Sequence, residues 1–155
     1  PRSATKGKSK SHVLVVGMDS MMTQLARCCH PAPPDEIVGF VTRGKGVTVH
    51  RIDCPNVRNL ENVARSRMID VSWGTSEDAV YPVDIYIVAR DRIGLIKDIS
   101  EVLVKENLRV TGMNSMMSKG DVHMRFSVEI RSAEHLKNAL KAVRDLKGIL
   151  SARRA

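Results

Sequence analysis

The chain has 155 residues, and its 43% hydrophobic and 27% charged residues are typical of a folded globular protein rather than a disordered one. No segment approaches the roughly 20 apolar residues that a membrane span requires, and no signal-peptide pattern opens the chain, so we expect neither a membrane protein nor a secreted one. Three cysteines, two of them adjacent, are a poor basis for a disulfide framework and favour a reducing compartment. Because the chain begins at Pro1 and not at Met, we expect a fragment or a processed product.

The net charge of +8 is distributed unevenly along the chain. Residues 1–12 carry four basic side chains and no acidic one, and residues 80–155 carry 14 basic and 9 acidic side chains. Residues 13–79 are nearly balanced, with 7 basic and 8 acidic side chains. A basic excess favours polyanionic partners such as RNA, although a solubilising surface with a mobile tail has the same composition.

The predicted elements divide the chain into four parts. These are a disordered basic tail (1–12), a small α+β unit (13–73), a polar linker (74–79) and a second α+β unit (80–155). The first unit has only about 60 residues, which are marginal for a hydrophobic core, so we expect it to need a staple. Its apolar spacing and turn residues predict, in chain order, a strand (13–16), a short helix (18–27), a hairpin of two strands (36–42 and 47–50), a helix (55–64) and a strand (69–73).

The second unit has the clearer pattern. Apolar residues alternate in two of its predicted strands (81–87 and 122–130), and they follow helical spacing in two segments. The predicted order is a strand (81–87), a helix (95–107), two strands (108–117 and 122–130), a helix capped by Ser132, and a last strand that begins at Ile149. This βαββαβ order is the ferredoxin-like arrangement, so the predicted fold class is α+β.

Cys28, Cys29, His50 and Cys54 are the best candidates for a functional site. A Cys₃His set satisfies a tetrahedral zinc ion and leaves no position open for water, so such a site is structural. Adjacent side chains tend to diverge, so binding of one metal by Cys28 and Cys29 demands an unusual turn. The spacing therefore leaves three alternatives open: metal ligands (with His30 as a substitute ligand), buried or free thiols, and a catalytic Cys–His pair.

Two parts of the chain are candidates for contact with nucleic acid, the hairpin tip of the first unit and the sheet of the second unit. The hairpin tip with Arg43 and Lys45, followed by Arg51, presents cations and exposed amides that suit phosphates, although a solvated turn is the alternative. The second unit shares its topology with the RNA-recognition motif, which stacks bases on aromatic residues of its middle strands. Phe126 is predicted to face the helices, and aromatic residues make up only 3% of the chain, so we expect no base stacking on this sheet.

Two segments resemble one known family. Residues 25–40, which begin Leu-Ala-Arg-Cys-Cys-His-Pro, and residues 44–54, which end in His-Arg-x-x-Cys, resemble the C-terminal region of stringent-response GTP pyrophosphokinases, the RelA/SpoT family. Among these, the chain is most similar to the RelA-type, ribosome-associated synthetases. Residues 88–99 resemble the ACT domain that ends those proteins. One departure is Pro34, where the family usually has Gly before the aspartate.

The resemblance implies a parent enzyme that makes (p)ppGpp by moving pyrophosphate from ATP to the 3′ hydroxyl of GTP or GDP, in catalytic domains that lie outside this chain. It implies that a zinc-finger (conserved-cysteine) domain and an ACT domain are regulatory. They would hold a cytoplasmic enzyme against ribosomal RNA while it senses uncharged tRNA. The implied zinc ligands are Cys28, Cys29, His50 and Cys54, and the implied RNA contacts are Arg43, Lys45 and Arg51.

The ACT resemblance also supports an alternative function of a different class. ACT domains bind small amino acids at the loop between the first strand and the first helix, which here is Asp91-Arg92-Ile93-Gly94. Gly94 permits close backbone approach and a helix N-terminus suits a carboxylate, although a plain helix entry is the alternative. In this interpretation the ACT sheet senses an amino acid, pairs with a second copy as a homodimer, and controls a bifunctional (p)ppGpp synthetase and hydrolase.

Overall fold

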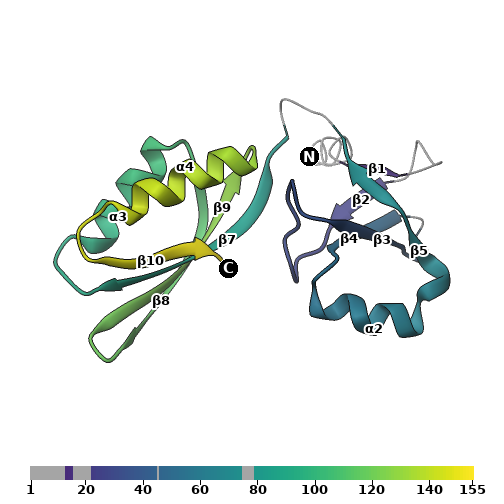
Figure 1. The fold of residues 1–155 in the computed structure, drawn as a ribbon, viewed down its shortest axis with the longest axis horizontal. Helices are drawn as coiled ribbons and strands as arrows, with labels where there is room; N and C mark the ends of the chain where they lie inside the picture. Colours follow the sequence, from purple (N-terminus) through teal and green to yellow (C-terminus); the bar gives the residue numbers. More distant parts are fainter. Residues whose placement is uncertain (1–12, 16–21, 45, 75–78) are drawn as a thin grey trace. The chain divides into compact units, whose positions relative to one another are not determined.

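The chain divides into two compact units, residues 1–79 and residues 80–155 (Figure 1). None of the helices in the described part of the chain has the length and apolar content needed to cross a membrane. The predicted tail over 1–12 and most of the predicted linker lie outside the described residues. The computed structural model describes residues 13–15, 22–44, 46–74 and 79–155.

The first unit is built on a four-stranded sheet of order β2-β4-β3-β5. β2 runs parallel to β4, whereas β3 is antiparallel to both of its neighbours. A separate antiparallel pair joins β1 to β6. The elements are β1 (Val13–Val15), β2 (Met22–Leu25), β3 (Ile37–Val41), β4 (Gly46–Arg51), α2 (Pro55–Val63), the 3₁₀-helix η2 (Arg65–Arg67), β5 (Met68–Ile69) and β6 (Val71–Trp73).

The β3–β4 hairpin and the helix that starts at Pro55 are confirmed. Side chains alternate between the two faces of a strand, so the pairing of Val38 with His50 places both on the same face. That face packs against α2, where Phe40, Cys54 and Val57 belong to one buried cluster. The opposite face holds a second buried cluster, formed by Val47 and Val49 with partly buried side chains that include Ile69, Val71 and Trp73.

The prediction of a short helix within residues 18–27 is wrong for residues 22–27, the part of this segment that the structure describes. Residues 22–25 form the parallel strand β2, in which Thr23 is buried, and Ala26 donates its N–H to the oxygen of Val49 at 2.8 Å. Helix-forming residues such as Met22 and Leu25 adopt a strand here because β4 offers an open edge, and long-range pairing outweighs local propensity.

The single strand expected over 69–73 is two strands in the structure. β5 pairs with β3, whereas β6 pairs with β1 in the separate two-stranded sheet. The predicted alternation itself is confirmed, because Ile69, Val71 and Trp73 all pack on the Val47–Val49 cluster. The chain therefore changes partner at Asp70 while its buried face stays the same.

Gly39 is the position where the first sheet approaches its neighbours most closely. A Cβ atom on Gly39 would lie 2.8 Å from a Val47 methyl carbon and 2.9 Å from one of Val71, and both side chains are stiff because they branch at Cβ. We expect Gly39→Ala to lower the free energy of unfolding of the first unit by about 1–3 kcal/mol, the usual cost of overpacking. Urea unfolding followed by Trp73 fluorescence measures this loss.

Gly44 provides the matched control for Gly39. A Cβ atom there would meet no heavy atom within 4 Å, so Gly44→Ala should leave the unfolding midpoint of the first unit almost unchanged. Equal stability of the two alanine variants would contradict the packing assigned to Gly39.

The second unit has the predicted βαββαβ order, and its α+β fold class is confirmed. The four strands form an antiparallel sheet of order β10-β7-β9-β8, with β7 and β9 in the middle. Both helices cover one face of this sheet (Figure 1). The elements are β7 (Tyr81–Arg90), α3 (Leu95–Lys105), β8 (Arg109–Ser118), β9 (Asp121–Ile130), α4 (Ala133–Arg144) and β10 (Ile149–Arg154).

The helix-covered face of the sheet forms the core of the second unit. Phe126 is 1% exposed, and Ile85, Ile87 and Met124 are fully buried beside it. The predicted cap of α4 is confirmed, because the Ser132 hydroxyl accepts a hydrogen bond from the N–H of His135 at 3.1 Å. The second face of the sheet is not covered by either helix of this unit (Figure 1).

Candidate metal centre

Four candidate ligands from three elements converge in the first unit. Cys28 and Cys29 lie in the turn after β2, His50 lies near the end of β4, and Cys54 is the N-cap residue of α2. Their ligand atoms all lie within 4.8 Å of one another. His50 and Cys54 are buried, whereas Cys29 is partly exposed and Cys28 is exposed. The structure thus brings together all four predicted ligands, and His30 is not part of this cluster.

Four of the six distances between ligand atoms of the cluster are close to those of a tetrahedral zinc site. A regular tetrahedron with Zn–S bonds of about 2.3 Å and a Zn–N bond of about 2.0–2.1 Å has S···S edges of about 3.8 Å and S···N edges of about 3.6 Å. The Sγ of Cys28 lies 4.0 Å from the Sγ of Cys29 and 3.6 Å from that of Cys54. The Nδ1 of His50 lies 3.5 Å from the Sγ of Cys28 and 3.9 Å from that of Cys29.

The backbone explains how two adjacent cysteines reach one site. The N–H of His30 bonds to the oxygen of Ala26 at 3.1 Å and closes a tight turn around both cysteines. His30 has a φ of 45°, in the left-handed region, which reverses the chain immediately after Cys29. This turn brings the two Sγ atoms within 4.0 Å, so the unusual turn that the adjacent pair demands is present.

The pKa values of Cys28, Cys29 and His50 are shifted in different directions. Burial raises the pKa of Cys29 to about 12, although its Sγ accepts a hydrogen bond from the N–H of Arg51 at 3.3 Å. Burial also raises the pKa of Cys28, but hydrogen bonds from Asn56, Cys54 and Cys29 outweigh it, so the pKa of Cys28 is lowered overall. Burial lowers the pKa of His50, which favours the neutral imidazole that binds metals.

The residues present fit a bound divalent metal. Three sulfur atoms and one imidazole nitrogen fill four positions, so a zinc ion here would have no site for water or substrate and would act structurally. Thiols this close can ionise together only when a cation balances their charge, and metal binding displaces their protons. A nucleophile–base pair needs one thiol beside the imidazole, whereas this cluster has three, so a metal site explains the arrangement better than thiol catalysis.

The predicted RNA-contact residues lie in different environments. Arg43 is exposed in the turn between β3 and β4, and Lys45 lies outside the described residues. Arg51 is partly buried, and its guanidinium is already paired: its Nε and Nη2 donate to the carboxylate of Asp53 at 3.0 and 2.9 Å, and its Nε lies 4.0 Å from the carboxylate of Asp35. Arg43 is therefore the better placed of the two described cations to meet a polyanion.

The predicted ACT ligand loop borders a hollow of about 450 Å³ in the second unit. Asp91, Arg92 and Gly94 line this hollow, whereas Ile93 is fully exposed and does not. Gly94 has a φ of 80°, in the left-handed region that favours glycine, and it is the N-cap of α3. The Nη1 of Arg92 forms an ion pair with the carboxylate of Asp98 at 2.9 Å, and its Nε donates to the backbone oxygen of Lys147 at 3.1 Å.

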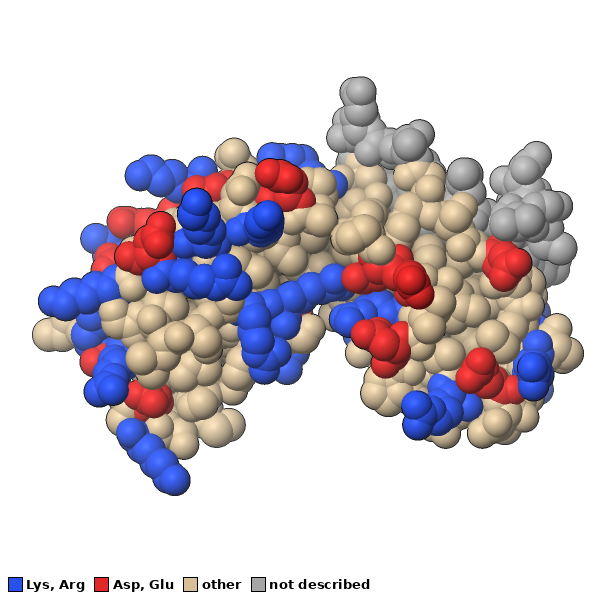
Figure 2. Space-filling model, in the orientation of Figure 1, with Lys and Arg blue, Asp and Glu red and all other residues tan. Residues whose placement is uncertain are grey.

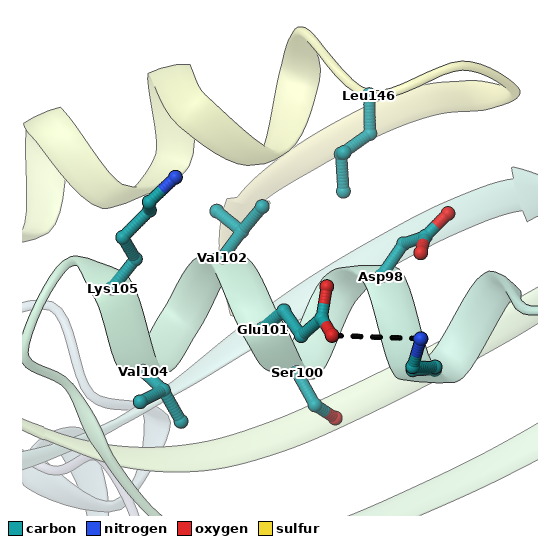
Figure 3. A pocket seen from close by; sticks show the side chains of 8 residues that line it. Asp98, Ser100, Glu101, Val102, Val104, Lys105 and Leu146 are labelled. Atoms are coloured by element: carbon teal, nitrogen blue, oxygen red, sulfur yellow. Dashed lines mark ion pairs between the residues drawn. The ribbon is translucent and has the colours of Figure 1, made fainter.

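A larger and mostly apolar hollow of about 610 Å³ lies on the outer side of α3 (Figure 3). Val102 and Val104 of α3 border it together with Leu146, which follows α4. At its rim, Lys97 pairs with Glu101 at 3.6 Å. No residue predicted as a site lines this hollow.

Comparison with known proteins identifies both units. The family profile of the RelA/SpoT RIS domain matches residues 13–74, and that of the ACT domain matches residues 77–154. The metal-ligand cluster thus lies within the RIS match, and the βαββαβ unit corresponds to the ACT match.

Relatives named GTP pyrophosphokinase match nearly the whole chain. That of Photobacterium angustum is 38% identical over 151 residues, which cover 96% of this chain and 20% of that protein. That of Escherichia coli is 36% identical over 154 residues, with the same coverage of 96% and 20%. That of Streptomyces coelicolor is 39% identical over 138 residues, which cover 88% of this chain and 16% of that protein. The chain therefore spans about one fifth of the length of the curated relatives it matches.

A solved structure of an ACT domain is similar to half of this chain. The crystal structure of the ACT domain from the GTP pyrophosphokinase of Chlorobium tepidum is 17% identical and covers 50% of this chain and 100% of that chain, with a TM-score of 0.46. The family assignment rests on the two domain matches and on the identity to the relatives. The chain belongs to the RelA/SpoT family, and it is a regulatory module of that family, made of a RIS domain followed by an ACT domain.

Proposed function

We propose that this chain docks a cytoplasmic (p)ppGpp synthetase on ribosomal RNA, where the parent enzyme senses uncharged tRNA during amino-acid starvation. The parent would transfer pyrophosphate from ATP to GTP or GDP, in catalytic domains outside this chain. The observation that carries the proposal is the convergence of four candidate metal ligands at the base of the β3–β4 hairpin, whose tip presents Arg43.

Zinc is the metal that this site suits. Thiolate and imidazole ligands in tetrahedral arrangement favour zinc over the oxygen-preferring calcium and magnesium ions. The ion would tie the turn after β2, the strand β4 and the start of α2 to one point, through Cys28, Cys29, His50 and Cys54. A hairpin fixed at its base presents its tip in one orientation, which lowers the entropy cost of binding RNA.

Charge at the tip supports contact with phosphates. Arg43 is exposed there, and the Thr42 side chain closes the turn by accepting the N–H of Gly46 and donating to the Gly46 oxygen, both at 3.2 Å. Figure 2 shows further Lys and Arg side chains, most of them over the second unit on the left. The basic excess of that unit adds a general attraction to RNA that salt would screen.

Co-sedimentation with ribosomes over a salt series, with and without deacylated tRNA, tests this proposal. We expect saturable binding that weakens as salt rises and that strengthens when deacylated tRNA is present. Arg43→Ala should reduce the slope of log affinity against log salt by about 1, because one phosphate contact is lost.

Arg58→Ala is the matched control for Arg43→Ala, because Arg58 is an exposed arginine of the same unit that lies on α2. Arg58→Ala should bind like the unchanged chain. Binding that does not depend on salt, or that Arg43→Ala and Arg58→Ala weaken equally, would contradict docking through the hairpin tip.

Amino-acid sensing by the ACT domain is the second candidate function. The hollow of about 450 Å³ beside Asp91, Arg92 and Gly94 favours it, because the loop predicted to bind an amino acid borders a space of suitable size. A rise in the melting temperature of the second unit with valine or another small amino acid would support this function. An unchanged melting temperature across the small amino acids would argue against it.

Pairing of two ACT sheets belongs to the same candidate function. β8 is a ten-residue strand at the edge of the sheet, and Met113, Met116 and Met117 on it are exposed. Long exposed edge strands readily pair with another strand, so β8 is the edge through which a homodimer would form. Light scattering across a concentration series distinguishes a dimer from a monomer.

A further inference from the structure

The uncovered face of the ACT sheet carries an aromatic residue, Tyr86, in addition to the Phe126 on the helix face. The expectation of no base stacking rested on Phe126 of β9, which is buried on the helix face as predicted. Tyr86 lies on β7, the other middle strand, and points to the opposite face because it alternates with the buried Ile85 and Ile87. The sheet therefore has an aromatic side chain on its uncovered face after all.

Neighbouring strands place further planar and cationic groups around Tyr86. Its hydroxyl lies 2.8 Å from the Nδ1 of His123, and the two ring centroids are 6.0 Å apart. Arg153 of β10 lies over the Tyr86 ring, with its guanidinium carbon 5.1 Å from the ring centroid. Arg125 of β9 is directly opposite Tyr86 in the strand register and is half exposed.

Tyr86, His123 and Arg125 border one hollow of about 350 Å³. Asn114 and Met116 of β8 form its far side, since Asn114 pairs with Arg125 and Met116 pairs with His123 in the strand register. The volume is at the lower end of the range for small-molecule sites, so it suits one flat group rather than a large ligand. The lining residues are Tyr86, Asn114, Ser115, Met116, Ser118, His123 and Arg125.

The chemistry of this lining fits a nucleobase. Tyrosine, histidine and arginine present flat faces on which bases stack, and an asparagine amide can bond to a base edge. Arg125 retains an exposed guanidinium for a phosphate, although its Nη1 already contacts Asp84 at 3.1 Å. Four-stranded RNA-binding sheets hold unpaired bases in the same way, on flat side chains of their two middle strands.

We propose that the hollow bordered by Tyr86, His123 and Arg125 binds an unpaired nucleobase with its phosphate. The base would stack in the hollow beside Tyr86 and His123, with its edge toward Asn114 and its phosphate toward Arg125. The source of the base is either a single-stranded nucleic acid or a free nucleotide. This site lies in the second unit and does not depend on the metal centre or on docking through the hairpin.

Fluorescence anisotropy of the full chain with zinc tests the proposal. The probes are fluorescein-labelled oligo(A) and oligo(U) hexanucleotides, with AMP and GMP as competitors. Tyr86→Leu should weaken binding roughly 5- to 150-fold, the range for loss of one aromatic stacking partner. Tyr86→Phe keeps the ring and should retain most of the affinity. Val104→Ala, at a 67% exposed position on α3, is the control and should bind normally.

The competitors distinguish the two sources of the base. Displacement by AMP or GMP at concentrations similar to those of the hexanucleotides would support a free nucleotide, whereas displacement by oligonucleotides alone would support a single strand. Cys54→Ser should leave this binding intact even if ribosome docking is lost. Binding that is unchanged in Tyr86→Leu, or absence of binding with every probe, would overturn the proposal.

Discussion

Removal of zinc by a chelator is expected to unfold residues 13–74 and to leave residues 80–155 folded. The first unit has two small buried clusters, whereas structural zinc contributes about 10–16 kcal/mol in small metal-dependent domains. Trp73 reports this change, since it is the one tryptophan of the sequence and its Nε1–H donates to the oxygen of Asp35 at 2.9 Å. Its fluorescence emission should shift to longer wavelength as the chelator is added.

Cys54→Ser should produce the same unfolded first unit without a chelator. Cys54 is 5% exposed and belongs to the cluster of Phe40 and Val57, so its replacement removes a ligand and disturbs the core together. Added zinc should restore the chelated parent chain but not this variant. A Trp73 emission that stays unchanged under full chelation would show that the first unit folds without metal.

Phe126→Ala is expected to cause the largest loss of stability in the second unit. Phe126 is 1% exposed and is among the largest fully buried side chains of the described residues. Truncation of a buried phenylalanine leaves a cavity and typically costs about 3–5 kcal/mol. Urea unfolding followed by far-ultraviolet circular dichroism should show a lower midpoint for this unit, while the Trp73 transition of the first unit stays in place.

Met113→Ala is the matched control for Phe126→Ala. Met113 is the β8 residue directly opposite Phe126 in the strand register, but it is 41% exposed. Its truncation removes much less buried surface, so the loss of stability should be far smaller. Equal losses in the two variants would contradict the core assigned to the second unit.

Local pattern was sufficient to predict the fold of the second unit. Its strands alternate strictly along Tyr81–Arg90 and Asp121–Ile130, because one face packs on two helices and the other is uncovered. Helical stripes such as Leu136, Ala139 and Leu140 are equally regular and are buried as predicted. The strands β7 and β9 and the helices α3 and α4 each have one buried face, so the spacing of their apolar residues indicates both the type of element and the face that it buries.

Pairing between distant segments explains the two wrong predictions in the first unit. Residues 22–25 have no clear strand period, and they become β2 because they pair in parallel with β4, more than twenty residues later. Residues 68–73 alternate like one strand, yet they pair with β3 and then with β1. Local spacing carries no information about which partner a short strand selects.

The four residues that cluster as candidate ligands could be chosen from the sequence, but the geometry of the cluster could not. Residue type and family resemblance indicated Cys28, Cys29, His50 and Cys54. The chain turn that brings the Sγ atoms of Cys28 and Cys29 together includes His30 in the left-handed conformation. The spacing of residues in the sequence does not indicate this conformation. Tyr86 could have been found from the alternation of β7, because residues between the buried positions must lie on the opposite face.

Measurement of the metal itself tests the central claim of a closed Cys₃His site. X-ray absorption at the zinc edge, on chain purified without chelator, should show three sulfur ligands at about 2.3 Å and one nitrogen ligand at about 2.0–2.1 Å. Elemental analysis of the same sample should give one zinc per chain. A metal-free folded chain, or a zinc ion with an oxygen ligand in place of a sulfur, would contradict the site formed by Cys28, Cys29, His50 and Cys54.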